Sequence, residues 1–206
     1  MGRRRAEGRR HERGAALIEA AFVTPVFFLL LFGIFEFGLL FRNSLTTNNA
    51  AQQGARAASV GGRAPDTDYL VLRSIEHGVS AMGLQELEVV VVFRAQSPDD
   101  AVPPACLTNS VAATSPTSVA CNRYTASDFF LEIEDPATGV ATGNWQCGAS
   151  AVDRFWCPSG RATSLSTGTD YLGVYVETDH SFITGLFGGG RQLSETRIVR
   201  LEPDAN

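Results

Sequence analysis

The chain contains no lysine, and only three of its 206 residues are histidine. All 17 basic side chains are therefore arginine, which excludes a sortase-style linkage through a lysine side chain. His11 lies in a basic N-terminal stretch, and the two others, His77 and His180, form no cluster that suggests metal or general-base chemistry. A Walker A pattern, a GxSxG motif and a dinucleotide fingerprint are also missing. We therefore expect neither an enzyme nor a bound cofactor.

Three local patterns that can suggest chemistry have simpler interpretations. Asp179-His180-Ser181 is contiguous, whereas the members of a catalytic triad meet through the fold, so we interpret it as a turn. Gly188-Gly189-Gly190 predicts a flexible hairpin tip. The acidic pairs Asp66-x-Asp68 and Asp99-Asp100 are compatible with calcium outside the cell, and equally with solvated carboxylates or a helix cap.

A long apolar run occupies residues 20–41 and contains one charge, Glu36. At about 1.5 Å rise per residue it is long enough to cross a roughly 30 Å hydrocarbon layer, so we predict a transmembrane helix over residues 15–41. Residues 1–14 carry six Arg and two Glu, and such a basic leader stays on the cytoplasmic side. Near the outer end, Glu36 is expected to reach the outer headgroups, with an interhelical contact as the less favoured alternative.

The remaining residues, 42–206, are then an exported domain. They contain 11 Arg and 18 acidic residues, and this negative balance argues against a nucleic-acid partner. A cleaved secretory signal peptide is less consistent with the N-terminus. The apolar run is longer than the apolar region of a usual signal peptide, which has about 7 to 15 residues, and no clean cleavage site follows it. A helix-favouring, Ala-rich sequence instead continues through Ser59 before Gly61-Gly62. We expect one helix over residues 15–59, mildly kinked at Pro25.

The N-terminal sequence resembles that of a known family. Gly14-Ala-Ala-Leu-Ile-Glu19, placed behind an Arg-rich leader, resembles the class III signal of type IV pilin-like proteins. The pattern is more similar still to the TadE-like pseudopilins of Flp/Tad pilus systems. The matching segments are Thr24-Pro25, Gly33-Ile-Phe-Glu36-Phe-Gly38, Ala55-Arg56-Ala57-Ala58 and, near the end, Arg197-Ile-Val-Arg200-Leu-Glu202-Pro203.

This resemblance implies a processing site and a role. A prepilin-type peptidase would cut between Gly14 and Ala15, and Glu19 would pair with the new α-amino group of a neighbouring subunit and set the register. The protein would be a minor pilin or pseudopilin in the cytoplasmic membrane, acting in assembly, priming or decoration of a Tad-type pilus. Its partners would be the peptidase, other Tad pilins, the inner-membrane assembly platform and membrane lipid. Alternatively, Glu19 is an interfacial carboxylate that reaches the cytoplasmic headgroups.

Two other classes of protein remain open. One is an unprocessed single-pass membrane protein whose extracytoplasmic domain binds a ligand. The other is a secreted hydrolase or adhesin that signal peptidase releases, which would start near Ala50.

Beyond the membrane the sequence predicts an α+β fold, in which the long helix packs on a small antiparallel sheet. Small residues at helical spacing form a stripe that a sheet can approach closely: Ala50, Gly54, Ala57 and Ala58. Asp66 can cap a helix over residues 69–82. Alternating apolar residues predict strands over residues 86–94, 171–178 and 193–202.

Residues 96–169 form a predicted insertion that is rich in loops and contains all four cysteines. Cys106–Cys121 and Cys147–Cys157 are the favoured disulfides among three connectivities, and a zinc site is disfavoured because no CxxC occurs. Residues 128–133 are expected to form a strand or a short helix. The aromatic residues near the second cysteine pair, Trp145, Phe155 and Trp156, are interpreted as a small core of the loop in preference to a ligand site.

Overall fold

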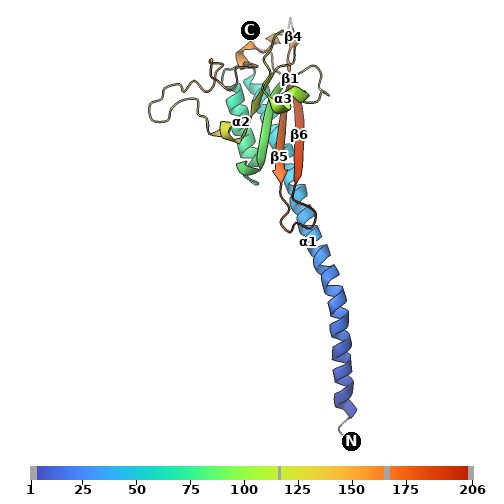
Figure 1. The fold of residues 1–206 in the computed structure, drawn as a ribbon. Coiled ribbons are helices and arrows are strands. Elements are labelled where there is room, and N and C mark those ends of the chain that lie inside the picture. The colour runs from blue at the N-terminus through green and yellow to red at the C-terminus, as the bar shows by residue number, and fades with distance from the viewer. Residues whose placement is uncertain (1–3, 116, 165–167, 204–206) are drawn as a thin grey trace. The chain divides into compact units, whose positions relative to one another are not determined.

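The computed structural model describes residues 4–115, 117–164 and 168–203. The chain forms two compact units. The first contains residues 1–41 and 182–189, and the second contains residues 42–181 and 190–206. The long helix α1 (Arg4–Gly61) contributes residues to both units (Figure 1).

The first unit consists of the N-terminal part of α1 and one loop. The helix extends back to Arg4, whereas the sequence predicted a start at residue 15. Because Arg, Ala and Glu favour helix and no proline precedes Pro25, the leader can continue the helix. Large apolar side chains of this part are exposed along its length from Leu17 to Phe41.

The second unit is built on an antiparallel sheet with the strand order β2-β1-β5-β6. Its strands are β1 (Leu87–Ala95), β2 (Cys121–Tyr124), β5 (Tyr171–His180) and β6 (Arg191–Arg200). A small second sheet pairs β3 (Thr163–Ser164) with β4 (Gly168–Thr169). The helical elements are α2 (Thr67–Val79), α3 (Pro104–Thr108) and the 3-10 helices η1 (Leu84–Glu86), η2 (Ala126–Phe130) and η3 (Pro158–Gly160). The predicted α+β class is confirmed.

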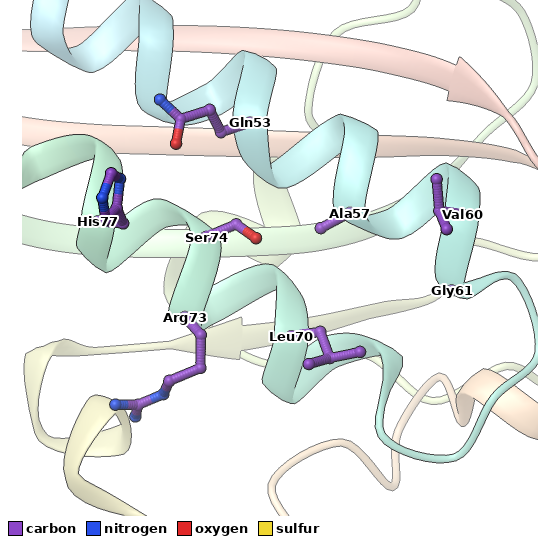
Figure 2. Close-up of a pocket in the computed structure, with 8 residues that line it drawn as sticks. All are labelled: Gln53, Ala57, Val60, Gly61, Leu70, Arg73, Ser74 and His77. Atoms are coloured by element: carbon purple, nitrogen blue, oxygen red, sulfur yellow. The ribbon is translucent and has the colours of Figure 1, made fainter.

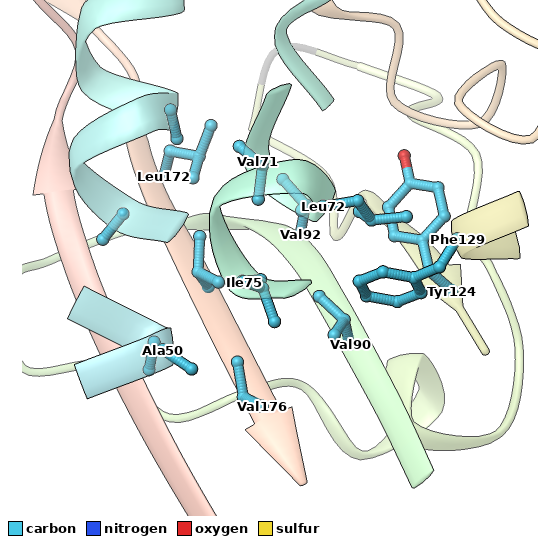
Figure 3. Packing of buried hydrophobic residues seen from close by; sticks show 14 of the residues in the cluster. Ala50, Val71, Leu72, Ile75, Val90, Val92, Tyr124, Phe129, Leu172 and Val176 are labelled. Carbon is cyan, nitrogen blue, oxygen red and sulfur yellow. The ribbon is translucent and has the colours of Figure 1, made fainter. Parts of the chain in front are cut away.

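The core lies on both faces of the sheet. On one face, β1 and β5 pack against α2 and the part of α1 that belongs to this unit (Figure 3). On the other face, alternate residues of β1 pack near α3 and the first disulfide. Successive side chains of β1 point to opposite faces of the sheet, and both sets are buried because both faces of this inner strand are covered. The main cluster on the helical face includes Ala50, Val71, Leu72, Ile75, Val90, Val92, Tyr124, Phe129, Leu172 and Val176.

The predicted stripe of small residues on α1 lies where α1 comes close to α2 and to the sheet. A Cβ atom on Gly54 would lie 2.8 Å from Cγ1 of Ile75 on α2 and 3.3 Å from Cγ1 of Val174 on β5. A Cβ atom on Gly78 of α2 would lie 2.8 Å from Cα of Ala50. The absence of side chains at these two glycines thus lets α1 pack against both α2 and the sheet.

Three local predictions are corrected by the structure. The predicted insertion is part of the sheet, because β2 pairs with β1 over Val90 to Phe93. Asp66 is the residue before α2, but its side chain makes no capping hydrogen bond. Asp179 and His180 continue β5 and do not form a turn, because each pairs with a residue of β6.

Candidate functional site

The predicted processing segment lies on an exposed part of α1. Gly14, Ala15 and Glu19 are all exposed within the first unit. A Cβ atom built on Gly14 would meet no atom within 4 Å. Packing inside this chain therefore does not require glycine at position 14, and a substitution there can be tested without disturbing a contact.

The helix that carries this segment has the length and composition to cross a membrane, within the stretch Gly14–Gly61. Its most apolar window has no buried residue. Phe22, Val26, Ile34 and Phe35 are examples of side chains that are more than half exposed. An apolar surface of this extent is costly in water and favourable in lipid.

Glu36 is buried within the first unit and is only 1 % exposed. Its Oε2 accepts a hydrogen bond from the backbone N–H of Ile183 at 3.1 Å. Its Oε1 accepts hydrogen bonds from the backbone N–H and the hydroxyl of Thr184, the latter at 2.7 Å. The prediction that Glu36 reaches the outer headgroups is therefore wrong, because loop 182–189 covers the carboxylate and provides its donors.

Asp68 is the centre of a buried polar network in the second unit. Arg161 donates through Nη2 to both carboxylate oxygens, at 2.7 and 2.8 Å, and neither side chain is exposed. The amide of Asn122 donates to Oδ2 at 2.8 Å, and the hydroxyl of Tyr124 donates to the same atom at 2.7 Å. The guanidinium of Arg161 also lies 4.3 Å from the ring centre of Trp156. The network joins α2, β2 and the segment before β3, and it assigns Asp68 a structural role in place of calcium binding.

The pKa shifts of two tyrosines predict a loss of stability in alkali. Burial and then the charge of Asp68 hold the pKa of Tyr124 well above its usual value of 10.0. Burial raises the pKa of Tyr175 to about 12. The chain has no lysine and no free cysteine, so these side-chain types do not add to the effect of the two tyrosine protons. The unfolded chain releases these protons near pH 10 and the folded chain retains them, so the free energy of unfolding decreases as the pH rises from about 10 to 12.

We expect the slope to be about 1.4 kcal/mol per pH unit for each protected tyrosine. Urea unfolding of the full chain in detergent, followed by tryptophan emission at several pH values, measures it. The only two tryptophans, Trp145 and Trp156, are both buried in the second unit and report on that unit. A Tyr175→Phe variant should have a shallower slope. A stability that stays constant from pH 9 to pH 12 would contradict the prediction.

The insertion is held by the two disulfides that the sequence favoured, Cys106–Cys121 and Cys147–Cys157. Near the second, the carboxylate of Asp153 accepts hydrogen bonds from the N–H groups of Gln146 at 3.0 Å and Cys147 at 2.9 Å. Both residues have left-handed φ angles, 67° and 63°. Burial raises the pKa of Asp153 even though these bonds favour its charged form. Asp153 thus fixes the strained turn that presents Cys147 to its partner.

The tryptophans of the insertion belong to the main core and do not form a core of their own. Trp145 stacks against Tyr124 with ring centres 5.8 Å apart, and its indole N–H donates to the carbonyl of Leu131 at 2.9 Å. Phe129, in η2, is buried in the same cluster. The predicted segment 128–133 therefore contains part of a short 3-10 helix, and Phe129 of this helix packs into the core.

Comparison with known proteins identifies one part of the chain. The family model of TadE-like proteins matches residues 14–56. These residues form a TadE-like region. The comparisons with curated proteins and with solved structures gave no significant match. The resemblance seen in the sequence is thereby supported over its N-terminal part.

The TadE-like region includes parts of α1 from both units. In the first unit it contains Gly14, Glu19 and Glu36, and in the second it contains the buried small residues Ala50 and Gly54. The match therefore starts at the predicted processing site and ends within the part of α1 that packs against α2 and the sheet.

A shallow groove of about 500 Å³ borders the end of the TadE-like region, between α1 and α2 (Figure 2). Its one formally charged lining residue, Arg73, is paired with Glu76 at 2.7 Å and donates to the carbonyl of Phe129. The groove thus presents mainly apolar and uncharged surface. In the described part of the chain, no group of three or more His, Cys, Asp or Glu side chains is placed to hold a metal ion. The groove is lined by Gln53, Ala57, Val60, Gly61, Leu70, Arg73, Ser74 and His77.

Sequence reasoning missed two sets of contacts. The pairs Asp68–Arg161 and Glu36–Thr184 join residues 93 and 148 positions apart, and no local pattern marks the first pair. A usable signal was nevertheless present in the second case. Residues 181–190 contain four large apolar residues and no charge, which is unusual for a hairpin loop.

Proposed function

We propose that the protein is a TadE-like minor pilin or pseudopilin that acts in assembly, priming or decoration of a Tad-type pilus. Residues 15–41 of α1 cross the cytoplasmic membrane, with the basic leader inside and the second unit outside. The observation that carries the proposal is that the TadE-like match begins at Gly14 and includes Glu19. These are the residues that such a protein needs for processing and for lateral packing.

The proposed function involves two steps, cleavage of the leader and pairing with a neighbouring subunit. A prepilin-type peptidase hydrolyses the Gly14–Ala15 peptide bond, which leaves Ala15 with a free α-amino group. The protonated amine then pairs with Glu19 of a neighbouring subunit in the membrane, where an unpaired carboxylate is costly. Other Tad pilins, the assembly platform of the inner membrane and lipid are the partners. The chain itself catalyses nothing and requires no cofactor.

Mass spectrometry of the N-terminus tests the proposal, with the protein expressed beside its own secretion machinery. We expect the membrane fraction to start at Ala15, and the Gly14→Ala variant to keep its leader. Gly38→Ala is the matched control, because a Cβ atom built on Gly38 would also meet no atom within 4 Å. This variant should be processed normally.

Other N-termini favour the other classes. A wild-type protein that retains Met1 or Gly2 would contradict the proposal and favour an unprocessed receptor with an extracytoplasmic binding domain. A start near Ala50 would indicate release by signal peptidase. In a second arm, Glu19→Ala should be cleaved and then lost from the assembled structure, whereas a receptor would be unaffected.

A further inference from the structure

The loop between β5 and β6 has an unusual composition for a hairpin tip. Its sequence from Ser181 to Gly190 has no charged residue, and it contains Phe182, Ile183, Leu186 and Phe187. Ile183 is 78 % exposed, Leu186 is 56 % exposed and Phe187 is 41 % exposed. Hairpin loops in water are normally polar, so this loop presents apolar side chains where none is expected.

The loop is fixed to the apolar helix within the first unit. The ring centres of Phe187 and Phe37 are 5.1 Å apart, and those of Phe182 and Phe187 are 6.1 Å apart. The Phe187 ring lies over Gly33, where a Cβ atom would be 3.6 Å from its Cζ. Loop 182–189 therefore packs on the same stretch of α1 that carries exposed Ile34 and Phe35. The exposed apolar surface of the loop is continuous with that of the membrane-spanning helix.

Hydrogen bonds to Glu36 allow loop 182–189 to lie in an apolar medium. Backbone N–H groups without acceptors are strongly disfavoured in lipid, and so is a carboxylate without donors. The carboxylate of Glu36 accepts from the N–H groups of Ile183 and Thr184 and from the Thr184 hydroxyl. One interaction thus satisfies polar groups of both the helix and the loop.

We propose that loop 182–189 inserts into the bilayer interface beside α1, as a second membrane contact held by Glu36. Its partner is the headgroup–acyl boundary of the lipid, with Ile183, Leu186 and Phe187 among the acyl chains. The loop carries no charge for a protein partner to recognise, and its apolar surface adjoins the lipid-facing helix. The flanking charges of Asp179 and Arg191 mark where the chain returns to water. This inference goes beyond the role in pilus assembly and holds whether or not Gly14 is cleaved.

Tryptophan placed on the loop tests the insertion. Full-length Leu186→Trp is reconstituted in phosphatidylcholine vesicles whose acyl chains carry bromine near the headgroup or near the chain end. We expect blue-shifted emission in addition to the wild-type signal, with stronger quenching by bromine near the headgroup. Phe41→Trp, at an exposed position on α1, is the positive control, and the wild-type pair Trp145 and Trp156 gives the baseline.

The contribution of Glu36 is tested in the same system. Glu36→Ala should remove most of the lipid quenching of Leu186→Trp, and Glu36→Gln should retain part of it, because one side-chain acceptor remains. Gly38→Ala, on the same helix and with no atom within 4 Å of the added Cβ, should leave the quenching unchanged. An unchanged signal in Glu36→Ala would overturn the role of Glu36. Quenching of Leu186→Trp by aqueous acrylamide in place of lipid would overturn the insertion, and so would protection from both quenchers, which would place a protein there.

Discussion

Asp68→Ala is expected to lower the free energy of unfolding of the second unit by about 3 to 5 kcal/mol, because removing one partner of a buried ion pair leaves the other charge uncompensated. Arg161 would lose both of its bonds to the carboxylate in a place where its side chain has no exposed surface. Asn122 and Tyr124 would each lose an acceptor as well. The total free energy of unfolding of a domain of this size is about 5 to 15 kcal/mol. This one substitution therefore removes a large part of the stability.

The measurement is urea unfolding of the full chain in detergent, followed by the emission of Trp145 and Trp156. Asp66→Ala is the matched control, because Asp66 lies two positions earlier and makes no side-chain capping bond. We expect a change within about 0.5 kcal/mol for that control, as for most substitutions away from such features. An Asp68→Ala/Arg161→Met variant should be more stable than Asp68→Ala alone, since it leaves no unpaired charge. Equal stability of Asp66→Ala and Asp68→Ala would contradict the prediction.

The elements that could be predicted from the sequence are those with a local signal. The apolar run of residues 20–41 has a length that can span a membrane, and the strand at β5 alternates as Leu172, Val174 and Val176, all of which are buried. The TadE-like pattern also lies within one contiguous stretch. In each case the physical constraint acts on neighbouring residues, so the pattern is visible before the fold is known.

The long-range polar contacts of Asp68 had no such signal. Asp68 and Arg161 come from segments that the sequence assigned to a helix start and to a loop-rich insertion, and only the folded chain brings them together. The short strand β2 was also missed, because its four residues, Cys-Asn-Arg-Tyr, show no simple apolar alternation. Two of them, Asn122 and Tyr124, bind Asp68. Assigning the insertion to loops therefore concealed both an edge strand and the three side chains that bind Asp68.

These corrections change the interpretation of residues 96–169. The segment supplies β2 to the sheet, Trp145, Trp156 and Phe129 to the main core, and Arg161 to Asp68. A segment with so many core contacts contributes to the stability of the whole second unit. Its two disulfides should then stabilise the unit as a whole, and not only a surface loop.

Removal of the disulfides is accordingly expected to have the second large effect. By the chain-entropy account, closing loops of 10 and 15 residues stabilises the folded state by about 3 kcal/mol each. Cys106 and Cys121 are fully buried beside β1, whereas Cys147 and Cys157 are partly exposed. The Cys106→Ala/Cys121→Ala pair should therefore be the more damaging, because it also loses packed sulfur atoms.

Removing both disulfides should decrease the free energy of unfolding by about 6 kcal/mol, comparable with the whole stability of a small domain. We expect the four-alanine chain to be unfolded in its second unit without denaturant, with the tryptophan emission of exposed indoles. Each two-alanine variant should remain folded and unfold at a lower urea concentration than the wild type. If the four-alanine chain unfolded at the wild-type midpoint, the contacts of Trp145, Trp156 and Arg161 would alone suffice to hold the insertion, and covalent closure would contribute nothing measurable.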